Sequence, residues 1–256
     1  MASGTVSPTL AVFERHLVLY RRLWQASVFS SFVLPLLFLL SIGVGVGGYV
    51  GSIEGVDYLA WIVPGVLAST VFSLALGEST YPVFGDFKWV RAYHAMRAAP
   101  VGPSHMVYGH LLYMVFRAEV ATVVFLLVVA FFGGLRSPWA LATPLVSALL
   151  AVATAAPVTA FSASIENDNY FTVVFRFVQI PATLLAGVFF PVTQLPEVLR
   201  PFAYASPLWH AVEMCRAATL GRDTPWPLAV HVGVLVVFAA VGTVLSVRAY
   251  RRRLER

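Results

Sequence analysis

The 256-residue chain has one lysine, one cysteine and few charged residues of either sign. Because Cys215 has no second cysteine to pair with, the chain forms no internal disulfide. The lone lysine, Lys88, follows Phe87, so the phosphate-binding motif G-x-x-x-x-G-K-[ST] is absent. Only 11% of the residues are charged and 59% are hydrophobic, whereas a soluble domain carries about 25% charge. The composition therefore predicts a protein of the lipid bilayer.

Side chains that could form a metal or acyl-transfer site are scattered. The six histidines include no H-x4-D pair, and His105 and His110 are five residues apart, which separates their faces on a helix. Gly43, Gly45 and Gly48 match G-x-G-x-x-G formally, but they end a hydrophobic run instead of following a strand, so they indicate close helix packing. We expect no catalytic residue, cofactor or metal in this chain.

Six hydrophobic runs are the main feature that the sequence does contain. A helix needs about 20 residues to cross ~30 Å of hydrocarbon. The runs cover residues 26–48, 58–77, 110–134, 139–163, 171–190 and 226–247. The third has a short apolar remainder, because Arg117 and Glu119 lie near its start. The first should be an uncleaved anchor, since Glu14 interrupts the basic residues before it. The predicted fold class is an all-α membrane protein with six transmembrane helices.

Positive charge is divided unevenly between the two sides of this topology. Four of the 17 Lys and Arg residues, Arg136, Arg200, Arg216 and Arg222, fall on the side away from the termini. The other thirteen lie with the termini, and cytoplasmic loops retain positive charge, so both termini are expected in the cytoplasm of a bacterial inner membrane. The high pI of ≈ 9.6 therefore reflects basic residues that set the topology and contact anionic lipid headgroups, and we expect no nucleic acid partner.

Residues 8–25 precede the first run and alternate apolar and basic side chains. At helical spacing, Val12 and Leu19 are set apart from Arg21 and Arg22. The pattern predicts an amphipathic helix on the inner leaflet. A plain basic flank of the first span is the alternative.

A loop at residues 79–109 connects the second and third runs on the cytoplasmic side. It is basic and aromatic, and Pro100, Gly102 and Pro103 break it into two expected short helices, the second capped by the Ser104 hydroxyl. A docking surface and a solvated connector explain this composition equally well.

Two charges fall at membrane depth, where each costs at least ~2.5 kcal/mol unless it is paired or hydrated. Arg117 and Glu119 are these residues, with Glu78 and Arg176 near the inner ends of neighbouring runs. We expect an ion-pair network that joins the third span to the second or fifth. In the alternative, both side chains extend to water. The polar link at 164–172 is expected to be a tight turn.

Residues 189–222 are apolar, but Pro191, Pro196, Pro201 and Pro207 interrupt them. Proline removes a backbone donor, so a bilayer tolerates such a segment only where protein or a water-lined cavity satisfies the freed carbonyls. We therefore expect short re-entrant or interfacial helices on the outer side, between spans five and six.

Two pairs of opposite charge occur in the same region at a spacing of three residues. They are Glu197 with Arg200 and Glu213 with Arg216. Such pairs stabilise exposed helices, so both are expected at the surface.

Two motifs carry a resemblance to a known family. F-x-P-x-x-x-L-P spans residues 189–196 and is followed by P-L-x-H at residues 207–210. In the cytoplasmic loop, Pro100 and Val101 are followed by Gly109 after seven residues. The chain resembles the permeases of type-two ATP-binding-cassette exporters, particularly the nodulation-type lipooligosaccharide and daunorubicin-resistance branches. The resemblance covers essentially the whole chain as one transmembrane domain, 1–256.

That resemblance implies a non-catalytic half-transporter that dimerises, most simply with itself, and binds two separate cytoplasmic ATPase subunits holding ATP and Mg. It implies a coupling helix at 97–105 that contacts the ATPase through Arg97, Pro100, Val101, Ser104 and His105. It also implies an outer substrate gate at Phe189, Phe190, Pro191, Gln194 and Pro196.

An apolar pathway with few fixed charges suits an amphipathic cargo such as a glycolipid, lipo-oligosaccharide or polysaccharide. Multidrug or antibiotic efflux is the alternative. A proton-coupled secondary transporter is less favoured, because the sequence shows no inverted repeats and only Arg117 and Glu119 as intramembrane charges. A membrane-embedded transferase would need the clustered polar site that the sequence lacks.

Overall fold

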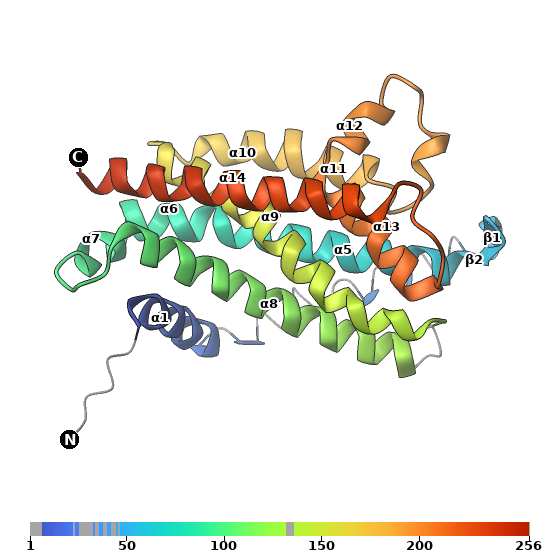
Figure 1. Cartoon of the computed structure of the whole chain (residues 1–256), viewed down its shortest axis with the longest axis horizontal. Coiled ribbons are helices and arrows are strands. Elements are labelled where there is room, and N and C mark those ends of the chain that lie inside the picture. The colour runs from blue at the N-terminus through green and yellow to red at the C-terminus, as the bar shows by residue number, and fades with distance from the viewer. Residues whose placement is uncertain are drawn as a thin grey trace.

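The computed structural model describes residues 7–22, 24, 25, 33, 36, 37, 40, 41, 45, 47–131 and 136–255. The long helices run side by side along one axis (Figure 1). The elements in chain order are α1 (Pro8–Arg22), α4 (Gly47–Val50), β1 (Ser52–Ile53), β2 (Val56–Asp57), α5 (Tyr58–Ser79), α6 (Tyr81–Lys88), α7 (Ala92–Met96), α8 (Pro103–Phe131), η2 (Pro138–Ala142), α9 (Thr143–Ser164), α10 (Asn169–Val174), η3 (Phe175–Gln179), α11 (Ile180–Leu185), η4 (Val192–Gln194), α12 (Arg200–Tyr204), α13 (Pro207–Leu220) and α14 (Leu228–Glu255).

Four helices in the described part of the chain are long and apolar enough to cross a membrane. They span Tyr58–Lys88, Pro103–Ala130, Pro138–Ser164 and Leu228–Glu255 and correspond to the second, third, fourth and sixth predicted runs. The predicted first span, 26–48, lies almost wholly outside the described residues. The all-α membrane fold is therefore confirmed, with four candidate spans observed among the described residues.

The fifth predicted run, 171–190, is not one regular helix. It consists of α10, a single π-helical segment η3, and α11, and the helical run ends at Leu185. Pro181 stands in the first turn of α11, where its missing N–H breaks the regular ladder. The remainder up to residue 190 is turn and bend, with Gly187 at φ 73°.

Close packing around α9 holds the bundle together. Ala151, Ala155 and Ala156 on α9 are fully buried, so neighbouring helices approach its backbone. A Cβ built on Gly242 of α14 would lie 2.5 Å from Pro157 Cδ, and Ser246 donates to the Ala156 carbonyl at 2.6 Å. α14 therefore packs directly against the backbone of α9.

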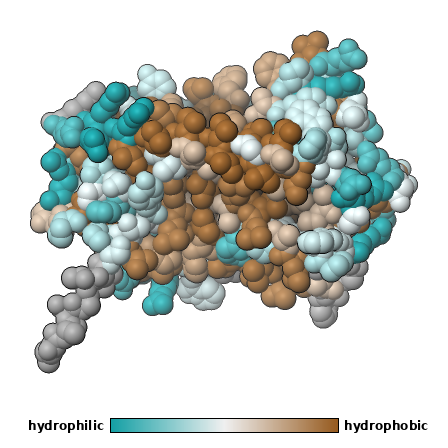
Figure 2. All heavy atoms as spheres, in the orientation of Figure 1, coloured by the Kyte–Doolittle hydropathy of each residue, from teal (hydrophilic) through white to brown (hydrophobic). Residues whose placement is uncertain are grey.

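The spans differ in how much protein covers them. In the most apolar window of each, 72% of the residues of Tyr58–Lys88 are buried, against 17% of Leu228–Glu255. An apolar helix that its own chain leaves uncovered is suited to contact lipid or another protein chain. Figure 2 shows the result, a brown apolar band across the middle of the molecule with hydrophilic residues gathered at both ends.

The two ends carry different elements. α1, α7 and the last turns of α14 lie at one end, which we call the α7 end, and the β1–β2 hairpin, α12 and α13 lie at the other, the α13 end (Figure 1). At the hairpin, Ser52 pairs with Asp57 and Ile53 with Val56. Glu54 and Gly55 both have positive φ, as a two-residue turn requires. The Asp57 carboxylate then caps α5 by accepting from the Leu59 N–H at 3.0 Å.

Candidate functional site

The corner between α6 and α8 carries a short helix, but not at the predicted residues. The helix is α7, Ala92–Met96, whereas residues 97–100 form turns and 101–102 are irregular. The Arg97 and Ala98 N–H groups bond to carbonyls three residues back, which tightens the end of α7 before Pro100. Because proline disfavours the α region in the residue before it, the helix cannot continue through 97–105.

The cap of α8 also differs from the prediction. Pro103 is the first helical residue, so Ser104 lies inside the first turn instead of at the cap position. His105 does the capping, because its Nδ1 accepts from the Gly102 N–H at 3.1 Å. This is the return half of a capping box, with an imidazole in place of the usual Glu or Gln.

An aromatic cluster ties this corner to the end of α14. Tyr93 of α7 is fully buried between Phe87 of α6 and Tyr250 of α14, with ring centroids 4.7 Å and 5.0 Å away. Arg97 donates to the Leu254 carbonyl. A displacement of α7 must therefore move α14 or break this packing.

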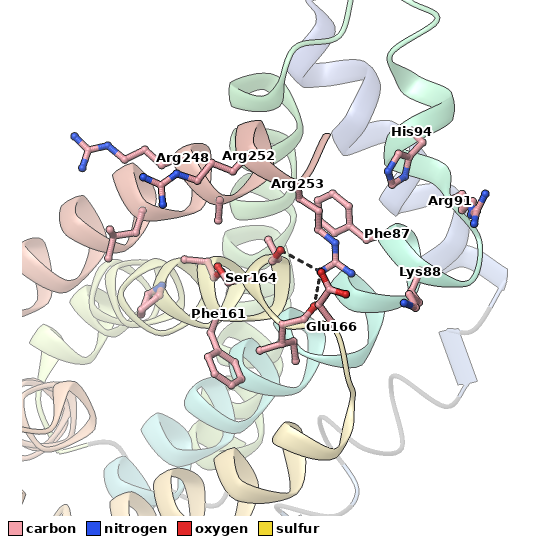
Figure 3. Close-up of a pocket in the computed structure, with 16 residues that line it drawn as sticks. Phe87, Lys88, Arg91, His94, Phe161, Ser164, Glu166, Arg248, Arg252 and Arg253 are labelled. Atoms are coloured by element: carbon pink, nitrogen blue, oxygen red, sulfur yellow. Dashed lines mark hydrogen bonds between the residues drawn. The ribbon is translucent and has the colours of Figure 1, made fainter. Parts of the chain in front are cut away.

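The end of α9 is held by the same region. The Arg253 guanidinium donates to the carbonyls of Ser162, Ala163 and Ile165 at 2.9–3.0 Å. Figure 3 shows Arg253 reaching the end of α9, near Ser164 and Glu166. These carbonyls have no further helical N–H partners, and a cation there also suits the helix dipole. Arg253 lies 4.7 Å from the centroid of the Phe87 ring, so α6, α9 and α14 meet at one side chain.

The predicted N-terminal helix is present as α1, and it packs against α6 and α8. Arg15 forms two hydrogen bonds of 2.7 Å with the Asp86 carboxylate. Val12 is buried where Gly109 allows α1 to approach α8, while Leu19 is exposed at 42%. The helix is thus covered by protein on one face and keeps apolar side chains on another.

His16 lies inside this contact. Its ring stacks on Tyr113 at 4.9 Å with an interplanar angle of 12°. Burial, with a smaller effect of the nearby Arg15 charge, lowers the pKa of His16 to about 4. His16 is therefore a neutral packing residue.

Arg117 and Glu119 have different environments. Arg117 is buried, donates to Glu78 at 2.8 Å and to the Tyr113 hydroxyl at 3.1 Å, and lies 4.9 Å from the centroid of the Tyr20 ring. This ion pair links α8 to α5. Glu119 is half-buried and forms no ion pair with any described residue. Arg176 is exposed and takes no part in the Arg117 pair.

At the α13 end, prolines start the short helices that the sequence led us to expect. Pro201 opens α12 and Pro207 opens α13, where the Ser206 hydroxyl accepts from the Leu208 N–H at 3.3 Å. In the segment before α12, Arg200 donates to the Leu195 carbonyl at 3.0 Å and to the Thr193 carbonyl at 2.8 Å. Each break thus has a local partner for its backbone groups.

Four of the five predicted gate residues line one cavity of about 500 Å³ between this region and the hairpin. Phe189 and Phe190 are half-buried in its wall, next to Pro191 and Gln194. The Tyr58 hydroxyl from the start of α5 donates to the Phe189 carbonyl at 3.4 Å. Pro196 lies exposed outside this cavity.

The prediction that Glu213 and Arg216 form a surface pair is wrong. Arg216 is 6% exposed, donates to Glu213 and, at 2.7 Å, to the Gly187 carbonyl, and lies 3.8 Å from the Trp61 ring centroid. Helical spacing gave no signal of this, because α13 is covered on all sides: the consecutive residues 208–212 are buried, and so are Met214, Cys215 and Thr219 around Arg216. By contrast, the Glu197–Arg200 pair is exposed, at 4.0 Å.

Two histidines that looked scattered in the sequence meet in space. His210 of α13 and His231 of α14 approach with their Nδ1 atoms 2.9 Å apart, and His210 Nε2 lies 3.0 Å from the Tyr204 carbonyl. Their sequence separation gave no signal of this contact. The described residues contain no group of three His, Cys, Asp or Glu side chains that could hold a metal ion.

Comparison with known protein families identifies the family of this chain. Residues 8–220 match the family model described as ABC-2 type transporter. The chain belongs to this family. It is thus a membrane permease of the ABC-2 type, and the matched residues include α1, the α7 corner, the gate segment and α13.

Curated relatives extend the similarity over almost the full length. The chain is 29% identical over 250 residues to Nodulation protein J of Rhizobium leguminosarum bv. viciae, covering 96% of this chain and 95% of that protein. It is 29% identical over 245 residues to Nodulation protein J of Rhizobium meliloti strain 1021. It is also 26% identical over 233 residues to the inner membrane transport permease YadH of Escherichia coli K12, covering 89% of this chain and 88% of YadH.

Proposed function

We propose that this ABC-2 permease is the membrane subunit of an exporter driven by two copies of a separate cytoplasmic ATPase. The observation that carries the proposal is the α7 corner, which is exposed at its tip and joined to α14 through Tyr93, Tyr250 and Arg97. A partner that moves this corner would pull on a membrane helix. The chain's own lack of a phosphate-binding lysine motif assigns hydrolysis to the partner.

In this proposal the α7 end faces the cytoplasm and the chain crosses the membrane six times. Support comes from thirteen basic residues on that side against four on the other. A total of six spans requires that residues 26–48 form span one and that the broken helix at 169–185 forms span five. α1 would then lie along the inner membrane surface, and residues 189–222 would form re-entrant or interfacial helices on the outer side.

The contact residues divide into two roles. Pro100, Val101, Ser104 and His105 would form the surface that meets the ATPase, together with the exposed residues of α7. Arg97 would act as a positioning residue, since it already bonds to the Leu254 carbonyl. ATP-driven closure of the partner would move two such corners, one on each chain of a homodimer, as rigid bodies.

The proposed cargo is an amphipathic lipid-linked saccharide. Phe189, Phe190, Pro191 and Gln194 would line its exit, where aromatic faces suit a sugar ring or an acyl chain. The likeness to two nodulation proteins J over nearly their full length supports the nodulation-type branch of the family. Efflux of a hydrophobic drug is a second outcome that the assay below distinguishes.

Reconstitution in liposomes tests the proposal. With the ATPase that co-purifies from native membranes, the chain should move a fluorescent lipo-oligosaccharide in an ATP-dependent way, and without that ATPase it should neither hydrolyse ATP nor transport. Arg97→Ala should lower the cargo moved per ATP hydrolysed, whereas Arg136→Ala at the opposite end should not. ATP-dependent movement of daunorubicin without saccharide transport would show that the cargo is a hydrophobic drug and not a lipid-linked saccharide. Transport by the lone chain that collapses with the proton gradient would overturn the mechanism.

A further inference from the structure

A cavity with a basic rim opens at the α7 end, between α6, the end of α9 and the last turns of α14 (Figure 3). Its volume is about 1160 Å³. Figure 3 shows Arg248 and Arg252 extending from α14 on one side, and Lys88, Arg91 and His94 on the other. The floor is apolar, formed by Pro157, Phe161 and Leu245 among others.

The charge of this cavity is strongly positive. Among the described residues that line it, five are Lys or Arg and a single one, Glu166, is acidic. Arg253 is committed to the carbonyls at the end of α9. Lys88, Arg91, Arg248 and Arg252 are exposed and form no ion pair with a described residue. Their mutual repulsion favours an anion among them.

An apolar groove continues from this cavity along the membrane-spanning surface. It has a volume of about 690 Å³ and runs between α9, the broken helix α10–η3–α11, and α14. Pro157 and Phe161 line both spaces, so the groove begins where the basic cavity ends. Its walls are almost entirely aliphatic and aromatic, with Val178, Phe177 and Phe238 along its length.

We propose that cavity and groove form one site for an anionic glycerophospholipid. The phosphate lies between Lys88 and Arg252, and an acyl chain follows Phe161 and Val178 along the groove. A basic pocket between helices on the cytoplasmic side, opening into an apolar groove, matches the two chemical halves of such a lipid. The site differs from the cargo cavity at the α13 end, and it depends on the α7 end lying at a membrane surface instead of on the nature of the cargo.

Native mass spectrometry of the full chain in detergent tests this directly. Titration with dioleoylphosphatidylglycerol should retain one lipid, and dioleoylphosphatidylcholine, with the same chains, should bind at least tenfold more weakly. Lys88→Gln and Arg252→Gln should each weaken retention about fivefold, since a basic residue near an anionic headgroup contributes about one factor of five. Arg251→Gln, the adjacent exposed residue outside the cavity, is the matched control and should change nothing.

The groove is tested by filling it. Val178→Trp should reduce retention, whereas Ile180→Trp, on the same helix but outside the groove, should not. Equal binding of the two lipids, or an equal loss in Arg251→Gln, would refute the site. If soluble glycerophosphate displaced the lipid at an equal concentration, the cavity would bind a free anion, and the lipid proposal would be wrong. A loss of dimer in Val178→Trp with unchanged lipid retention would show that a second copy of the chain fills the groove, and the proposal would be wrong.

Discussion

The close contact between α1 and α8 requires glycine at position 109, because there is no room for a side chain there. A Cβ added to Gly109 would lie 2.6 Å from Val12 Cβ, 2.7 Å from Val12 Cγ1 and 2.9 Å from the Thr9 carbonyl oxygen. Two of these neighbours are a Cβ and a backbone atom, so rotation of a side chain cannot relieve the overlap. Gly109→Ala should therefore push α1 away from α8.

The magnitude follows from two opposing effects. Overpacking a tight contact costs about 1–3 kcal/mol, while replacing glycine in a helix by alanine favours the helix by about 1 kcal/mol. Gly77→Ala isolates the second effect, because Gly77 lies in α5 and has no atom within 4 Å of an added Cβ. The free energies of unfolding of the two variants should thus differ by about 1–3 kcal/mol, with Gly109→Ala the less stable.

Denaturant unfolding of the purified chain in detergent measures this difference, and a disulfide between cysteines placed on α1 and α8 reports the position of α1. Val12→Gly in the Gly109→Ala background removes both atoms nearest the new methyl group and should restore the rate of this cross-link, although glycine in α1 itself costs stability. Equal stabilisation by Gly109→Ala and Gly77→Ala, with the cross-link formed equally fast, would refute the packing argument.

Three further predictions concern buried polar groups. The pKa of His16 is about 4 in the fold and about 6.5 when exposed, so stability should fall by about 3 kcal/mol as pH drops from 6.5 to 4; His16→Phe should flatten that part of a pH-unfolding curve. Arg216→Met removes the partner of the Glu213 carboxylate, which is 14% exposed, and should lower the free energy of unfolding by up to about 3 kcal/mol, with the added Glu213→Gln change restoring part of it in the same melt. Arg117→Met should destabilise the chain more than Arg117→Met combined with Glu78→Gln, and a double-mutant cycle showing no coupling would contradict the 2.8 Å pair.

Hydrophobic run length was enough to find the helices but not their ends. α14 continues to Glu255, beyond the predicted end at 247, because Ser246, Tyr250 and Leu254 recur every four residues and keep one face buried while arginines take the others. α8 begins at Pro103, so the second short helix that was expected in the loop and the third run form one continuous helix, with Met106, Val107 and His110 buried along its first turns. Both extensions are amphipathic, which a count of uncharged residues does not detect.

The broken segments were predictable in kind but not in detail. Proline positions gave the starts of α12 and α13, because the ring fixes φ and removes a donor wherever it stands. They did not give the π-helical segment at Phe175–Gln179, which depends on how α10 and α11 pack. The buried state of Arg216 depends on Trp61 and Gly187, two residues far away in the sequence. Long-range partners of this kind leave no local pattern.

The proposed ATPase contact and the proposed lipid site at the α7 end are held by some of the same residues. Phe87 packs on Tyr93 and Tyr250, and it also lines the basic cavity beside Arg253. Arg253 in turn holds the end of α9, whose residues Pro157 and Phe161 form the start of the groove. A force applied to α7 therefore reaches the walls of the lipid site before it reaches the middle of the bundle. If both proposals hold, phosphatidylglycerol should alter the ATPase rate of the complete complex, and Arg252→Gln should remove that response while Arg251→Gln preserves it.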